Sequence, residues 1–257
     1  MSNCMCENFK DCERFHKLLS MNDGKAALKY LKIRKISPEI ISKFKIGWCP
    51  VDDPKIHLRG RITVPLKNMY GEILAFAGRI PTYNNGGDVC SLYNNKIIEY
   101  IKDGKKVRNE IKWWHESFPK RNYLYGLSET WKNIYEKNVV VIVEGECDFW
   151  ACYQNGIKNI VALLGTNFTL FHIRKLLSLC ENIILMMDGD DAGNSSWNKS
   201  LEKYNELKEV SFNYFNLDRI QLPDGHDPSS FISEFGIDSI IDSYEKILKD
   251  YNERPPF

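Results

Sequence analysis

The sequence predicts an α/β protein whose second half is built on a mainly parallel sheet, and three observations support this prediction. From residue 139 onward, short β-branched and apolar runs alternate with stretches suited to helices. The connections between them are short and several contain glycine. Acidic residues follow several of the apolar runs, where the strands of such a sheet would end. We therefore expect helices on both faces of the sheet and a functional site at the carboxyl ends of its strands.

The elements of this half can be assigned in order. The run "VVVIV" predicts a strand that ends at Glu144, followed by a helix up to Asn155. The segments after it predict strand, helix, strand, helix and strand in turn, over residues 158–167, 169–180, 181–190, 191–208 and 209–217. The stretch "EKILKDYNE" predicts a last helix at residues 245–253.

Charge divides the chain at the same place. Residues 1–138 carry 25 Lys and Arg against 15 Asp and Glu, whereas residues 139–257 carry 10 against 19. A basic half commonly faces a polyanion and an acidic half can hold cations, although segregated surface charge would give the same composition. We predict four parts: a tail at 1–26 that enters its first helix near Glu13, a smaller basic α/β subdomain at 27–138, an acidic α/β domain at 139–217, and an acidic loop with a short helical tail at 218–257.

The sequence offers no membrane segment. No apolar run approaches the roughly 20 residues that a membrane-spanning helix needs. The first residues contain Glu7, Lys10, Asp11 and Glu13 where a signal peptide would have its apolar core. We expect a cytoplasmic protein with no membrane partner.

Acidic side chains are the main candidates for chemistry. They are Glu144, Asp148, Asp188, Asp190, Asp224 and Asp227. Glu144, Asp188 and Asp190 stand at the ends of two predicted strands, and Asp224 and Asp227 follow the last one. Asp148, four residues after Glu144, could turn back toward the same edge from the first turn of a helix. Carboxylates held close together repel one another, so such a cluster needs a cation or shared protons. Ligands that are all oxygen suit Mg²⁺ or Mn²⁺.

The stretch "DGDD" combines two tasks. Asp188 and Asp190 are expected to face one metal centre, and Gly189 to let the backbone bend between them. Asp191 is expected to begin the next helix, although capping that helix could also explain both Asp190 and Asp191.

The amino terminus contains four residues that could bind zinc, in the arrangement C-x-C-x₅-C-x₃-H: Cys4, Cys6, Cys12 and His16. A C-x-C pair is not a usual zinc-ribbon knuckle, and little sequence is available to support such a site. The alternative is a thiol-containing tail that holds no metal.

Three segments then identify a family. "VEGECDFW", "VALLGTNFT" and "MMDGDDAGNSS" resemble the motifs of the Toprim domain, with spacing closest to the bacterial DnaG-type DNA primases. Upstream, "YLKIRKISPEIISKFKIGW", "RITVPLKNMYGEILAFAGR", with a turn at Tyr70 and Gly71, and "FPKRNYLYGL" resemble segments of the same catalytic core. Downstream, "LPDGHDPSSFI" resembles the segment that holds the last metal ligands. The resemblance extends from Leu28 to Ser239.

The resemblance implies roles for individual residues. Glu144, Asp188 and Asp190 would be catalytic and hold two or more Mg²⁺ or Mn²⁺ ions, joined by Asp148 and Asp227. Where the family often has a further aspartate, this chain has Ser229, which puts one ligand in doubt. The residues implied in binding template and nucleotide are Arg34, Arg61, Arg79, Lys112 and Lys120.

The function expected from this resemblance is that of a primase. Such an enzyme is a DNA-dependent RNA polymerase and nucleotidyltransferase, which makes short RNA primers from ribonucleoside triphosphates on single-stranded DNA during replication. One alternative is a Toprim nuclease or topoisomerase-like enzyme that uses the same carboxylates to cut. Another is an inactive accessory subunit that binds single-stranded DNA, which Ser229 would favour.

The chain resembles the catalytic core of the family alone, as in a stand-alone version encoded by a phage or plasmid. It contains no G-x-x-x-x-G-K-[ST] phosphate loop and no long zinc ribbon. A separate replicative helicase or other replication protein of the primosome is therefore expected to bring the enzyme to its template, in the host cytoplasm if the gene is a phage's.

Overall fold

The computed structural model describes residues 2–85, 88–91, 99–102, 105–108, 113–165, 167–210 and 215–253. The chain forms two compact units. The first contains Met1–Asn68 and Glu72–Phe118, and the second contains Met69–Gly71 and Pro119–Phe257. Among the helices of the described ranges, none has both the length and the apolar character needed to cross a bilayer.

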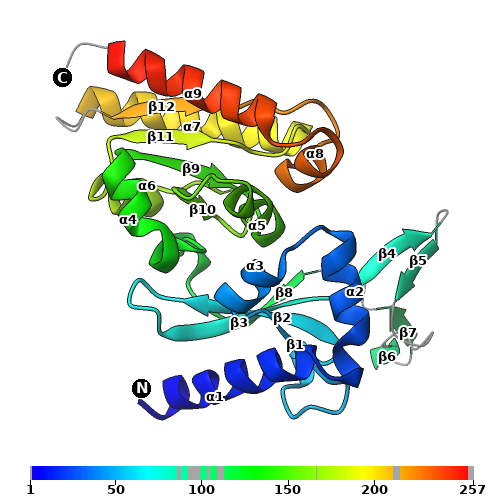
Figure 1. Cartoon of the computed structure of the whole chain (residues 1–257). Helices are drawn as coiled ribbons and strands as arrows, with labels where there is room; N and C mark the ends of the chain where they lie inside the picture. Colours follow the sequence, from blue (N-terminus) through cyan, green and yellow to red (C-terminus); the bar gives the residue numbers. More distant parts are fainter. Residues whose placement is uncertain are drawn as a thin grey trace. The chain divides into compact units, whose positions relative to one another are not determined.

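The first unit is built on an antiparallel sheet with the strand order β1-β2-β3-β8 (Figure 1). Its strands are β1 (Gly47–Cys49), β2 (Arg61–Lys67), β3 (Ile73–Arg79) and β8 (Trp113–His115). Its helices are α1 (Ser2–Leu19), α2 (Lys25–Ile33) and α3 (Pro38–Lys43), with short 3₁₀ turns η1 (Asn22–Gly24) and η2 (Ile56–Leu58). Two hairpins lie between β3 and β8: β4 (Thr82–Asn85) with β5 (Asp88–Ser91), and β6 (Glu99–Lys102) with β7 (Lys105–Arg108).

The turn expected at Tyr70 and Gly71 is confirmed. It joins β2 to β3, and the N–H of Asn68 donates to the carbonyl of Glu72 at 2.9 Å where the turn closes. Gly71 has a φ of +84°, a conformation that favours glycine.

The first helix begins much earlier than expected. The prediction of a tail that enters a helix near Glu13 is wrong, because α1 starts at Ser2. Asn8, Cys12, Phe15 and Leu19 recur at helical spacing and are all buried. Two of these positions carry a polar amide and a thiol, so the apolar stripe is hard to see in the sequence.

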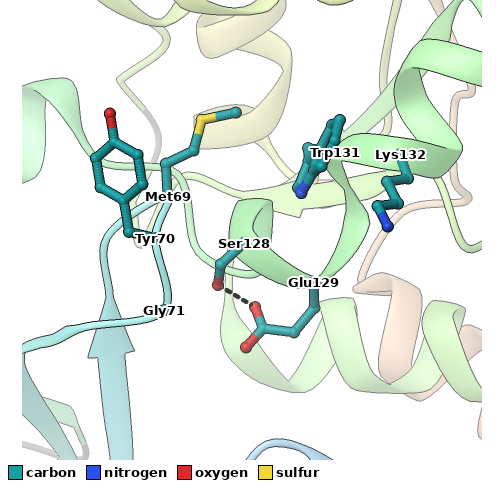
Figure 2. A pocket seen from close by; sticks show the side chains of 7 residues that line it. All are labelled: Met69, Tyr70, Gly71, Ser128, Glu129, Trp131 and Lys132. Atoms are coloured by element: carbon teal, nitrogen blue, oxygen red, sulfur yellow. Dashed lines mark hydrogen bonds between the residues drawn. The ribbon is translucent and has the colours of Figure 1, made fainter.

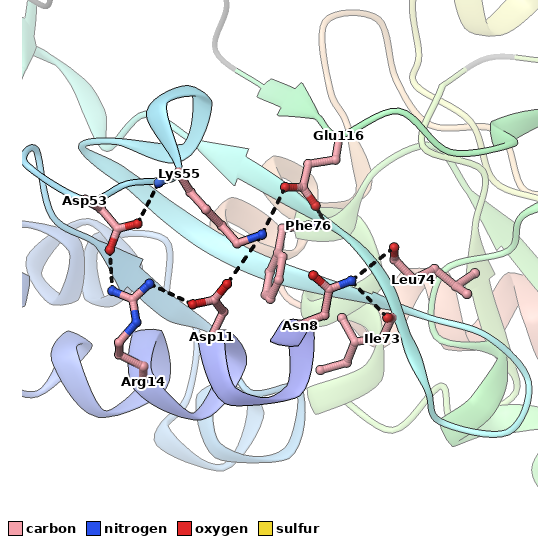
Figure 3. A network of polar contacts seen from close by, with 9 residues as sticks. All are labelled: Asn8, Asp11, Arg14, Asp53, Lys55, Ile73, Leu74, Phe76 and Glu116. Atoms are coloured by element: carbon pink, nitrogen blue, oxygen red, sulfur yellow. Dashed lines mark hydrogen bonds and ion pairs between the residues drawn. The ribbon is translucent and has the colours of Figure 1, made fainter. Parts of the chain in front are cut away.

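Polar contacts attach α1 to the sheet (Figure 3). Arg14 forms ion pairs with Asp11 and with Asp53, whose side chain is almost fully buried. The hydrogen bond to Asp53 is the main cause that raises the pKa of Arg14. Burial alone would raise the pKa of Asp53, but hydrogen bonds from Arg14 and from the N–H of Lys55 lower it overall. Lys55 extends this network, since its Nζ lies 3.6 Å from Oε1 of Glu116.

The second unit contains a parallel sheet with the strand order β10-β9-β11-β12 (Figure 1). Its strands are β9 (Val139–Val143), β10 (Ile160–Ala162), β11 (Asn182–Leu185) and β12 (Asn216–Arg219). Its helices are α4 (Leu127–Lys137), α5 (Glu146–Gln154), α6 (Leu170–Leu177), α7 (Asp191–Val210), α8 (Pro228–Phe235) and α9 (Asp238–Glu253), with a 3₁₀ turn η3 (Lys120–Asn122) before α4. This alternation of strands and helices is the predicted α/β fold.

The central strand β9 is buried throughout, which explains its unbroken run of valine and isoleucine. Both of its neighbours run parallel to it, so the residues after β9, β10 and β11 lie at the same edge of the sheet. The last strand is shorter than predicted. Glu209 and Val210 belong to the end of α7, and β12 begins only at Asn216.

Candidate metal centre

The first two candidate ligands follow neighbouring strands. Glu144 comes directly after β9, and Asp188 comes after β11 by way of two buried methionines. The N–H of Met186 donates to the carbonyl of Ile142 at 2.8 Å, so the pairing of the strands continues beyond β11. At the end of this ladder the N–H of Asp188 donates to Oε1 of Glu144 at 3.3 Å. The parallel pairing therefore brings the two acids together.

Burial and mutual repulsion change the acidity of this pair. Burial is the main cause that raises the pKa of Glu144, followed by the charges of Asp190 and Asp227. Burial is also the largest of the causes that raise the pKa of Asp188 to about 7. The negative charges of Glu144, Asp227 and Asp190 raise it further. Oδ1 of Asp188 is buried and has no hydrogen-bond partner within the described part of the chain. A buried, unpartnered carboxylate oxygen fits a site for a hard cation.

Asp148 lies in the first turn of α5 and is buried. Its two oxygens accept from the backbone N–H of Gly145 at 3.1 Å and of Ser229 at 3.2 Å. Burial raises its pKa well above the ordinary value, and the charges of Asp227 and Asp188 add to the effect. Asp148 therefore stands within electrostatic reach of the other acids.

Asp227 precedes α8 and caps it. Its Oδ1 accepts from the N–H of Ser230 at 2.6 Å, and its own N–H donates to the Ser230 hydroxyl at 3.0 Å. Asp224 lies one turn earlier and is exposed. Ser229, at the position where the family often has a further aspartate, is buried, and its backbone N–H is one of the two that donate to Asp148. Sequence reasoning missed this backbone donor, because only side chains can be read from a motif.

The "DGDD" turn is tightly packed. Asp191 is the first residue of α7, as expected, and Oδ1 of Asp190 accepts from the N–H of Gly193 at 2.8 Å. Asp190 therefore caps the helix as well as facing the cluster. A Cβ on Gly189 would lie 2.1 Å from the carbonyl oxygen of Pro223. Close approach of another segment, and not a left-handed bend, explains this glycine.

The charges of the candidate acids raise one another's pKa values, but their side chains do not form a complete set of metal ligands in the described part of the chain. Within the ranges that the structure describes, no three side chains of His, Cys, Asp or Glu already stand in the arrangement of a metal centre. The donor chemistry nevertheless fits Mg²⁺ or Mn²⁺, because the pKa values respond to several carboxylates at once and one buried oxygen is unpartnered.

Two predicted template-binding residues surround one tyrosine. The guanidinium carbons of Arg34 and Arg79 lie 5.6 Å and 5.7 Å from the ring centre of Tyr30. Nε of Arg79 also donates to the Tyr30 hydroxyl at 3.1 Å. The guanidinium carbon of Arg79 also lies 5.6 Å from the ring centre of Trp113. Sequence reasoning missed Tyr30, whose only signal was an aromatic residue four positions before an arginine.

Arg61, Lys120 and Lys112 are placed differently. Arg61 is buried at the start of β2, where Nη1 donates to the carbonyl of Gly78 at 3.3 Å and burial lowers its pKa to about 10. Lys120 is exposed on η3 in the other unit; partial burial lowers its pKa, while Glu146 opposes the effect. Lys112 lies outside the described residues.

The structure places two of the predicted zinc ligands, Cys6 and Cys12, in different environments on α1. Cys6 is exposed, whereas Cys12 is buried among Phe15, Cys49 and Phe76. Burial raises the pKa of the Cys12 thiol to about 11. Nδ1 of His16 is 2.8 Å from the carbonyl oxygen of Ile46. The structure does not bring Cys6 and Cys12 to one point, and the side chain of Cys4 lies outside the described residues.

A pocket of about 530 Å³ lies in the second unit (Figure 2). The residues that line it are Met69, Tyr70, Gly71, Ser128, Glu129, Trp131 and Lys132. Among the lining residues, the Ser128 hydroxyl donates to Oε2 of Glu129 at 2.6 Å. None of the predicted site residues lines this pocket.

The chain is similar to known proteins both in sequence and in fold. The Toprim domain family matches residues 138–212. The DNA primase of Rickettsia felis is 30% identical over 244 residues, which cover 82% of this chain and 36% of that protein. The chain thus spans about a third of the length of the Rickettsia primases that it matches.

Solved structures match over most of the chain. The primase catalytic core of E. coli is 25% identical, with a TM-score of 0.70 over 91% of this chain and 77% of that one. A DnaG primase catalytic domain bound to single-stranded DNA shares the fold at 24% identity, with a TM-score of 0.73 over 95% of this chain and 79% of that one.

Proposed function

The chain carries the Toprim-containing catalytic core of the bacterial DnaG-type DNA primases, and from that premise we propose that it is a DNA-dependent RNA polymerase that makes short RNA primers. Its substrates would be ribonucleoside triphosphates and its template single-stranded DNA. The observation that carries the proposal is the convergence of Glu144, Asp188 and their acidic neighbours at one sheet edge, with a buried unpartnered oxygen on Asp188.

In this proposal the acids bind divalent metals. Glu144, Asp188 and Asp190 would hold two or more Mg²⁺ or Mn²⁺ ions, and Asp148 and Asp227 would complete the set. When bound, such ions stabilise the attacking 3′-hydroxyl and the leaving oxygen of phosphoryl transfer. Asp190 can bind and still cap α7, since only its Oδ1 accepts from Gly193.

The basic residues would bind the anionic substrates. Arg34 and Arg79 present their guanidinium groups at fixed positions because both lie on Tyr30. Arginine can bind a phosphate through two hydrogen bonds, which suits a triphosphate or a template backbone. Arg61, Lys112 and Lys120 are proposed for the same task, by family position.

The DnaG catalytic domain solved with single-stranded DNA supports the choice of template. A replicative helicase or another replication protein is proposed as the partner that delivers the template. Zinc at the amino terminus is not part of the proposal, because Cys6 is exposed whereas Cys12 is buried in the apolar core.

One assay tests the function. The protein, single-stranded DNA, Mg²⁺ or Mn²⁺ and labelled ribonucleotides should yield short RNA. Asp188→Ala should abolish the product and retain the far-ultraviolet circular dichroism of the wild type, whereas Asp224→Ala, an exposed acid on the adjacent turn, should retain activity. Strand cleavage in place of synthesis would favour a Toprim nuclease. DNA binding without synthesis on any template, with or without a helicase, would favour an accessory subunit.

A further inference from the structure

One short segment, residues 223–230, contacts the turn between Asp188 and Asp190 and the side chain of Asp148, and it contains Asp227. We infer that His226 in this segment is a positioning residue for the metal centre. The inference rests on the proposed function, since it concerns the same carboxylates.

The backbone of the segment holds the "DGD" turn. The N–H of Gly189 donates to the carbonyl of His226 at 2.8 Å. The carbonyl oxygen of Pro223 lies so close that a Cβ on Gly189 would meet it at 2.1 Å. The turn between Asp188 and Asp190 is therefore fixed by the loop that lies against it, and its position depends on where that loop is held.

The ring of His226 holds the loop. It packs edge-on against Phe231, with ring centres 5.9 Å apart, and against Phe235 at 5.4 Å. The two phenylalanines contact each other at 5.1 Å, one turn apart on α8. Nδ1 of His226 is buried without a hydrogen-bond partner among the described residues, so this nitrogen does not hold the ring in place. Aromatic packing fixes it instead.

The same helix holds two further candidate ligands. The N–H groups of Ser229 and Ser230, in the first turn of α8, donate to Asp148 and Asp227. Gly225 adopts a φ of +79° directly before His226, which is a conformation for reversing the chain. The His226 ring is thus the side-chain link between the loop that fixes Asp188 and Asp190 and the helix that fixes Asp148 and Asp227.

The test uses three variants of the full chain, a fourth variant as a matched control, and two measurements. His226→Ala removes the ring, and His226→Phe restores an aromatic ring without imidazole. Phe235→Ala removes one packing partner and is a tolerable change, because Phe235 is 58% exposed. Phe171→Ala on α6 is the matched control, since Phe171 is also 58% exposed. The measurements are hydrogen exchange of the Gly189 amide in metal-free protein and the affinity for Mn²⁺ alone.

His226→Ala should speed exchange of the Gly189 amide and weaken Mn²⁺ binding by about tenfold, a typical effect of losing a group that supports metal ligands. Phe235→Ala should change the exchange rate and the Mn²⁺ affinity in the same direction. His226→Phe should restore both quantities to within about twofold of the wild type. The control, Phe171→Ala, should change neither quantity. Unchanged exchange in His226→Ala, or failure of His226→Phe to restore it, would overturn the inference. Should His226→Ala not fold, Phe235→Ala against Phe171→Ala decides. Absence of Mn²⁺ binding in the wild type would overturn the proposed function instead, while the exchange data would still decide whether the ring holds the turn.

Discussion

The hydroxyl of Tyr30 accepts a hydrogen bond from Nε of Arg79 at 3.1 Å, and the guanidinium of Arg34 lies on the same ring. Arg79 is 8% exposed, so its guanidinium depends on such partners for its position. Tyr30 thereby fixes two of the residues that we propose bind phosphates.

Tyr30→Phe should therefore weaken binding of single-stranded DNA by about three- to tenfold, while unfolding should become easier by about 1 kcal/mol. Fluorescence anisotropy with a labelled oligonucleotide measures the first effect and thermal denaturation the second. Tyr135→Phe is the control, because Tyr135 is 65% exposed on α4. Equal affinities for wild type and Tyr30→Phe would show that Tyr30 does not organise the arginines for DNA.

The Arg14–Asp53 pair predicts a stability effect in the first unit. Asp53→Asn removes the negative charge and replaces one of the two oxygens that accept from Arg14 and from the N–H of Lys55 by an NH₂ donor, so the free energy of unfolding should fall by about 2 kcal/mol. Asp52→Asn, at the exposed neighbouring acid, should change it by less than about 0.5 kcal/mol. Urea denaturation of both variants measures the difference.

The same pair predicts a pH effect. The pKa of Asp53 is lowered on folding, so its contribution to stability is present above the ordinary pKa of an aspartate and is lost as the pH falls through the lowered value. The difference in stability between wild type and Asp53→Asn should accordingly shrink in acid. A difference that stays constant down to pH 3 would contradict the ion pair as its source.

In metal-free protein, Asp188 should have the opposite effect on how stability depends on pH. Its pKa is raised to about 7, mainly by burial, so the folded protein binds this proton more tightly than the unfolded chain does. The stability of metal-free protein should then decrease as the pH rises from about 4 to about 7, the interval between the ordinary and the raised value.

Asp188→Asn removes this penalty. At pH 8 and without metal, the variant should melt about 2–4 °C above the wild type, corresponding to about 1 kcal/mol. Addition of Mg²⁺ should raise the melting temperature of the wild type and leave that of the variant almost unchanged. A variant that melts lower than the wild type at pH 8 would show that repulsion among the acids is not the dominant effect.

The sequence allowed prediction of the α/β unit and of the edge where its acids meet, because both follow from local patterns. An unbroken valine and isoleucine run specifies the buried β9, and parallel pairing brings Glu144 and Asp188 together. The start of α1 was mispredicted because Asn8 and Cys12 stand at core positions that a hydrophobic pattern would fill with aliphatic residues. The roles of the basic side chains and of the individual metal ligands stay predictions until they are measured.

Features that depend on contacts between distant segments could not be read from the sequence. The N–H of Ser229 on Asp148 is one such contact, since a backbone donor leaves no trace in residue types. The surroundings of Gly189 are another. The sequence suggested a need for backbone freedom, whereas the structure shows that the carbonyl of Pro223 occupies the space of a side chain.

Gly189→Ala separates these two explanations. Gly189 does not have a positive φ, so alanine would fit the backbone conformation, and the close backbone of Leu222 and Pro223 opposes it instead. We expect the variant to push the loop at residues 222–227 away from the turn, to lose about 2 kcal/mol of stability and to bind Mn²⁺ at least tenfold more weakly. Gly156→Ala is the control for backbone strain alone, since Gly156 has a φ of +108° with open space around it. That variant should lose about 1 kcal/mol and retain the wild-type affinity for Mn²⁺, because Gly156 lies beyond the end of α5. Unaltered Mn²⁺ affinity in Gly189→Ala would mean that the position of the loop does not govern the ligands on either side of the glycine.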